Sequence, residues 1–140
     1  MSKTLLYKIF GLGKIPRKIL PAIEQEGILL MDQGINGSIM FNNFRAPGRR
    51  YSRKISWFTG SVVLTRKCFW AFAFSKPVIS VPLDDERLRE LNCSLKNETT
   101  LCVLFDVSVF HEGWSGTIEC KFITPKARLF LEQIMEKASS

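Results

Sequence analysis

The stretch GSVVLTRKCFWAF, residues 60–72, predicts two strands joined by a tight turn. In its first half, Val62 and Leu64 fall on one side of an extended chain, and the opposite side takes Ser61, Val63 and Thr65. Arg66 and Lys67 form a polar two-residue turn. In the second half, Phe69 alternates with Trp70, and few positions are polar, so both faces of this strand are expected to be covered. The stretch therefore predicts an antiparallel β-hairpin.

Strand signals extend from this hairpin in both directions. Runs rich in Val, Ile, Phe and Trp are separated by Gly, Pro, Asn and Asp. The predicted strands are 28–44, 55–65, 68–74, 78–83, 91–95, 101–110 and 116–123. The segment DDERLREL, residues 84–91, predicts a turn or a single helical turn. Seven strands with short connections favour an antiparallel sandwich or barrel.

A helical extension is expected over residues 1–26. Ile15, Ile19 and Ile23 recur every four positions, and Gly27 is placed to end a helix. Pro21 removes one helical hydrogen bond, so the helix is expected to be kinked there or to be a short helix that begins there. Its isoleucines either pack on the domain or lie on a membrane surface.

A second helix is predicted over residues 125–138. Thr124 can cap this helix and Pro125 suits its first position. One face is formed by Ala127, Leu131, Ile134, Met135 and Ala138, with Phe130 beside it. This apolar face is expected to cover the open end or edge of a small barrel.

Seven strands followed by one helix is the element order of the pleckstrin-homology (PH) superfold, and two segments resemble its bacterial PH-like and GRAM-like branch. The segment 60–72 resembles that branch's glycine, apolar alternation, Thr, basic turn and apolar strand, and ISVPLDD at 79–85 resembles its Ile-Pro-Leu-Ser-Asp segment. The resemblance implies that residues 27–140 form a mainly β domain, a seven-stranded antiparallel barrel or sandwich capped by the C-terminal helix. It also implies a binding module. We expect no cofactor. The family's phosphoinositide spacing is absent, because Tyr51 and Ser52 separate Arg50 from Arg53.

Positive charge is concentrated in the first half of the chain. Residues 1–70 hold twelve Lys and Arg against three Asp and Glu, a net charge of +9, whereas residues 71–140 carry −2. The segment 45–54 contains no acidic residue. If residues 28–44 form one strand, it is expected to be the loop between the first two strands; if residues 32–37 form a hairpin turn instead, it is the next loop along the chain. Its candidate anion- or lipid-binding residues are Arg45, Arg49, Arg50, Tyr51, Arg53 and Lys54. Guanidinium groups suit phosphate because each offers a planar fork of donors.

Three functions remain open for this basic loop. In the first, the loop docks on an anionic membrane lipid or an acidic protein. In the second, the domain is a structural or assembly module with no small ligand, and the charges of the loop only keep it soluble. In the third, the loop binds nucleic acid weakly, with Tyr51 and Trp57 stacking on bases. We expect no catalytic residues and no metal site. His111 is the single histidine, and nothing in the spacing links it to Asp106 or Cys120.

The expected location is the cytoplasm, with peripheral attachment to a membrane as a further expectation. The four cysteines contain no CxxC pair and three lie in apolar or alternating surroundings, which favours free thiols and a reducing compartment. No apolar run approaches the length of about 20 residues that spans a bilayer.

Overall fold

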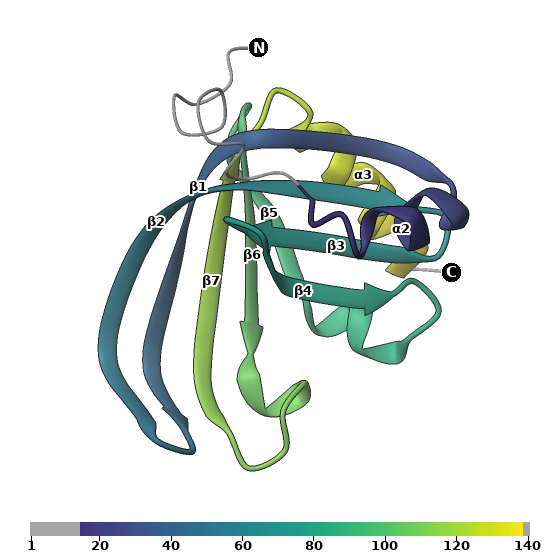
Figure 1. The fold of residues 1–140 in the computed structure, drawn as a ribbon. Coiled ribbons are helices and arrows are strands. Elements are labelled where there is room, and N and C mark those ends of the chain that lie inside the picture. Colours follow the sequence, from purple (N-terminus) through teal and green to yellow (C-terminus); the bar gives the residue numbers. More distant parts are fainter. Residues whose placement is uncertain (1–14, 139–140) are drawn as a thin grey trace.

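The computed structural model describes residues 15–138, in which seven strands form one antiparallel sheet (Figure 1). In chain order the strands are β1 (Ile28–Ala46), β2 (Arg49–Thr65), β3 (Cys68–Ala73), β4 (Lys76–Pro82), β5 (Asn92–Asn97), β6 (Thr100–Asp106) and β7 (Ser115–Ile123). Their order across the sheet is β4-β3-β2-β1-β7-β6-β5. The prediction of a mainly β fold with seven antiparallel strands is confirmed. The sheet is not closed into a barrel, because its edge strands β4 and β5 do not pair with one another.

The central hairpin forms as the sequence predicts. β2 and β3 pair antiparallel with Leu64 opposite Phe69, and Arg66 and Lys67 make the turn between them. Phe69 lies in the main core, and Phe72 on the other face is also fully buried. Both faces of β3 are therefore covered.

β1 is a single strand of 19 residues with a bulge at Gly34. The register against β2 shifts between Gln33 and Ile35, and Gly34 takes a φ of 70°, which costs a glycine little. Pairing then continues to Ala46, opposite Arg49. The expected loop over 45–54 is wrong: only Pro47 and Gly48 turn the chain, because the ladder between the two strands extends through the basic residues.

The main core lies on the inner side of the sheet and is closed by α3 (Ala127–Ala138). Ala127, Phe130 and Ile134 are buried, whereas Met135 is 57% exposed, so the predicted place of Met135 on the buried face is wrong. Phe130 lies at the centre of that face instead. The helix starts after Thr124, whose hydroxyl accepts a hydrogen bond from the Lys126 backbone and donates one to the buried carboxylate of Asp32.

A second, smaller core lies on the outer side of β2 and β3. The helix α2 (Leu20–Glu26), with Pro21 in its first turn, buries Ile23 completely against Val63 and Phe72. Glu26 accepts hydrogen bonds from the side chains of Thr65 and Trp70, which fixes the end of the helix to the sheet. Residues 15–26 therefore pack on the domain; the rest of the expected extension, residues 1–14, lies outside the described part.

Two short 3₁₀ helices interrupt the strands. η1 (Glu86–Glu90) forms the helical turn predicted within 84–91, and the Asp85 carboxylate caps it by accepting from the Arg87 backbone. η2 (Val107–Val109) follows β6, where the sequence predicted that the strand continues to Phe110. The strand ends at Asp106 because its carboxylate accepts from the Ser108 backbone and turns the chain.

Candidate functional site

The predicted anion-binding residues lie on the two arms of the long β1/β2 hairpin. Figure 1 shows this hairpin curving away from the helices, with its tip at the end opposite α2 and α3. Arg45 lies on β1, and β2 carries Arg49, Arg50, Tyr51, Arg53 and Lys54. At the tip, Pro47 precedes Gly48, which takes a φ of 76°, a combination typical of a type II turn. The turn geometry therefore explains this glycine.

Ring contacts identify the face of the hairpin arm that turns toward the protein. Phe44 and Tyr51 are cross-strand partners, and their rings stack with centroids 5.8 Å apart. Phe41 lies 5.0 Å from Phe44 and 5.5 Å from Tyr51, and Trp114 from the β6–β7 connection meets Phe44 edge-on. Tyr51 is thus half-buried in an aromatic cluster that supports the arm.

Strand pairing then divides the cations between two faces. Arg45 lies directly opposite Arg50 in the pair next to Phe44 and Tyr51, so these two arginines project to the other, outer face. The ammonium of Lys54 lies 4.4 Å from the centre of the Tyr51 ring, on the inner face. Neighbouring residues of a strand face opposite sides, so Arg53, the cross-strand partner of Asn42, projects outward.

The alternation of faces along β1 is broken by an irregularity at Asn43. This residue has a φ of 50°, and the register of β1 against β7 shifts between Asn42 and Arg45. The irregularity brings Phe41 and Phe44, three positions apart, onto one face. Arg45 therefore joins Arg53 on the outer face, which counting along the sequence does not predict.

The five cations of the hairpin are exposed, and none forms an ion pair with an acidic residue in the described part of the chain. Like charges directly opposite in a sheet are destabilising, so the Arg45–Arg50 pair is unfavourable unless an anion lies between the side chains. β3 pairs with β2 only at Gly60–Leu64, so the basic arm of β2 pairs with β1 alone. The cations therefore lie along an accessible strand.

Two large apolar side chains continue the outer face of the same arm. Ile55 and Trp57 follow Arg53 at alternate positions, and they are 52% and 69% exposed. We define the outer strip as Arg45, Arg50, Arg53, Ile55 and Trp57. The sequence prediction considered Trp57 only as a platform for bases and missed Ile55. The spacing Arg53-x-Ile55-x-Trp57 is the signal that would have identified both, once the strand was known to start at Arg49.

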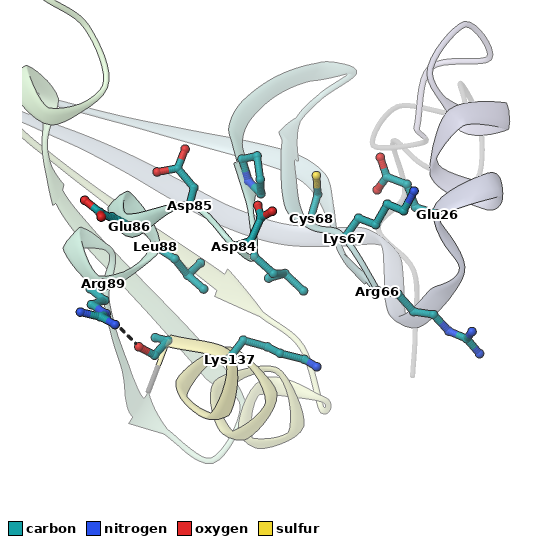
Figure 2. Close-up of a pocket in the computed structure, with 13 residues that line it drawn as sticks. Glu26, Arg66, Lys67, Cys68, Asp84, Asp85, Glu86, Leu88, Arg89 and Lys137 are labelled. Carbon is teal, nitrogen blue, oxygen red and sulfur yellow. Dashed lines mark hydrogen bonds between the residues drawn. The ribbon is translucent and has the colours of Figure 1, made fainter. Parts of the chain in front are cut away.

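A charged cleft of about 820 Å³ opens at the opposite end of the sheet, between the Arg66–Lys67 turn, the Pro82–Glu86 connection and the end of α3 (Figure 2). Three of its charged side chains make contacts within the protein. Glu26 accepts two hydrogen bonds, and Arg89 donates to the Ala138 carbonyl, as the dashed line in Figure 2 marks. The hydrogen bonds from Arg87 lower the pKa of Asp85 to about 2.

The cleft also contains a cysteine that is not activated. Burial and then the nearby carboxylates of Glu26 and Asp84 raise the pKa of the Cys68 thiol. A nucleophilic cysteine needs a lowered pKa, so that its thiol is ionised at neutral pH. Because Glu26, Asp85 and Arg89 make contacts within the protein and the thiol is not activated, this cleft is a weaker candidate for binding than the hairpin.

The residues considered for catalysis have structural positions. Asp106 caps η2, Cys120 is buried in the core, and exposed His111 stacks on Trp114 with ring centroids 4.1 Å apart. Burial raises the pKa of Cys120 to about 12, so this thiol stays protonated at neutral pH. Within residues 15–138, no three His, Cys, Asp or Glu side chains are grouped to hold a metal ion.

Neither described helix has the length and apolar character needed to cross a membrane. In comparisons with known proteins, the sequence matches no protein-family model and no curated protein.

Proposed function

We propose that this chain is a non-catalytic binding domain of the PH-like class that docks on an anionic membrane surface through the β1/β2 hairpin. The observation that carries the proposal is the placement of Arg45 opposite Arg50, at the tip of an exposed arm with no acidic side chain among residues 45–54. Anionic lipid phosphates would relieve this repulsion by accepting hydrogen bonds from both guanidinium groups.

The element order and the position of the hairpin support the PH-like class. Seven antiparallel strands precede α3, which closes the core, and the basic hairpin joins the first two strands at the end away from α3 (Figure 1). The sequence resemblance at 60–72 and 79–85 falls on β2, β3, β4 and the connection after β4. A peripheral location on the cytoplasmic leaflet, where anionic lipids are abundant, fits this function.

Vesicle co-sedimentation tests the proposal. We expect the protein to sediment with vesicles that contain about 30 mol% phosphatidylserine but not with neutral phosphatidylcholine vesicles, and to be released when salt rises from about 0.1 M to 1 M. The variant Arg49→Glu/Arg50→Glu is expected to lose about tenfold or more in affinity, because it reverses two charges next to the lipid.

The chain provides a matched control for that variant. Arg66 and Lys67 are also adjacent, exposed cations, but they form the two-residue turn at the other end of β2. Arg66→Glu/Lys67→Glu changes the net charge by the same amount and is expected to bind nearly as well as the wild type. Equal loss in both variants would mean that net charge alone drives binding, and no sedimentation with anionic vesicles would refute the proposal.

Assembly through strand edges is a second candidate function. β4 and β5 are the edges of an unclosed sheet, and an unpaired strand offers backbone donors and acceptors to another chain. If the protein assembles in this way, the charges of the hairpin serve only to keep the exposed arm of β2 from pairing with a strand of another chain. Concentration-dependent dimers that form equally well in the wild type and in Arg49→Glu/Arg50→Glu, together with no vesicle binding, would favour this function.

A further inference from the structure

The outer strip combines positive charge with apolar surface on one face of the hairpin. Arg45, Arg50 and Arg53 lie toward the tip, and Ile55 and Trp57 lie further along the same face of β2. A strand edge that only needs protection from aggregation uses charged side chains. Exposed Ile and Trp on such an edge increase the risk of association, so their presence indicates a surface that is covered by a partner.

We infer that the outer strip is the membrane-contacting face and that Trp57 inserts at the bilayer interface beside Ile55 while the three arginines bind lipid phosphates. The inference rests on the proposed function and adds the orientation of the hairpin. Trp has an apolar ring and one polar N–H, and such side chains concentrate at the boundary between headgroups and acyl chains. An aromatic and aliphatic pair next to cations matches an anionic bilayer surface in both charge and polarity.

The neighbouring strands leave this face positive. Cross-strand pairing places Met40 beside Ile55 and Ser38 beside Trp57, and neither adds charge. Two acidic residues face the same side, one from β7, which pairs with β1, and one from β6. On β7, Glu119 forms an ion pair of 3.7 Å with Lys121, and on β6 the Asp106 carboxylate accepts two hydrogen bonds from Ser108.

The opposite face of the arm is already occupied by protein contacts. Tyr51 stacks on Phe44, and the Lys54 ammonium lies over the Tyr51 ring. This excludes Tyr51 as the inserting aromatic side chain and assigns that position to Trp57. The hairpin is therefore expected to lie with its outer side on the bilayer rather than to insert its tip.

Tryptophan fluorescence with anionic and neutral vesicles tests the orientation. Trp57 is largely exposed, so we expect its emission to shift to shorter wavelength when anionic vesicles are added. The variant Trp57→Phe should still bind but should lose this shift, because Trp70 and Trp114 are held in contacts within the protein. Trp57→Ala is expected to bind about tenfold more weakly at unchanged thermal stability.

The outcomes separate this inference from the proposed function. Charge-dependent vesicle binding with a Trp57 emission that does not move, or with full affinity in Trp57→Ala, would overturn the orientation and leave the proposed function in place. No vesicle binding in any form overturns both. An emission maximum that shifts with single-stranded DNA but not with vesicles assigns the outer strip to nucleic acid. An emission maximum that is already at short wavelength without any addition means that the protein itself covers Trp57. Either result refutes the inference.

Discussion

Arg45 and Arg50 are direct cross-strand partners at the end of the β1/β2 hairpin, and both project to the outer face. Two like charges in this arrangement disfavour the hairpin by repulsion. The protein therefore carries a local conflict between the stability of the free hairpin and the density of positive charge at its tip. In the proposed function, an anionic surface would resolve the conflict by binding both guanidinium groups.

A charge reversal at Arg50 should separate stability from binding. Arg50→Glu places a carboxylate opposite Arg45, so we expect a melting temperature equal to or above that of the wild type at low salt, and weaker vesicle binding. The partner of Arg49 is Ala46, so Arg49→Glu creates no such pair and serves as the control. Differential scanning calorimetry at low and high salt measures the effect. A melting temperature lowered by Arg50→Glu but not by Arg49→Glu would contradict the repulsion.

The packing of α2 on the sheet should contribute strongly to stability. Ile23 is fully buried against Val63 and Phe72, so Ile23→Ala is expected to lower the free energy of unfolding by about 2–5 kcal/mol. Ile55→Ala, at a side chain that is 52% exposed, should change it by about 0.5 kcal/mol or less. Urea titration compares the two variants. An equally small effect at both positions would show that α2 is not held on the sheet in solution.

Gly60 lies where two strands approach too closely for a side chain. A Cβ atom there would lie 2.0 Å from the Phe72 carbonyl oxygen, so Gly60→Ala has to displace backbone, at an expected cost of about 1–3 kcal/mol. The adjacent Ser61 hydroxyl is buried without a hydrogen-bond partner among the described residues, so Ser61→Ala is expected to be neutral or stabilising. Chemical denaturation of both variants gives the comparison, and a stable Gly60→Ala protein would refute the close approach.

Cys120 should make stability depend on alkaline pH. Burial raises its pKa to about 12 in the folded protein, whereas the pKa of a thiol in the unfolded chain is about 8.5. The unfolded state therefore loses its proton first, and stability is lost as pH rises from about 9 toward 12, by up to about 1.4 kcal/mol per pH unit. The slope is measured from the free energies of unfolding between about pH 8 and pH 11. Cys120→Ala is expected to reduce the slope but not to abolish it, because burial also raises the pKa of Cys93 to about 12. An unchanged slope would show that the Cys120 thiol does not contribute.

Local patterns were sufficient for most of the secondary structure. Alternation around Arg66–Lys67 predicted the β2/β3 hairpin with its turn, and the cap at Thr124 predicted a C-terminal helix that begins just after it. For the basic segment 45–54 the sequence predicts a loop, because the segment lies between two predicted strands. Ladder hydrogen bonds to β1 and the stacking of Tyr51 on Phe44 hold it extended, and both depend on residues that pair only after folding.

Alternation, turn residues and charge are local properties, so they were enough to predict the strand-rich fold, the positions of most of the strands and the concentration of cations in residues 45–54. Tertiary structure decided which side each of those residues faces. The face of a strand residue depends on the register with its neighbours and on irregularities such as the one at Asn43, which reverses the alternation. For this reason only the folded hairpin places Arg45, Arg50 and Arg53 on one face with Ile55 and Trp57.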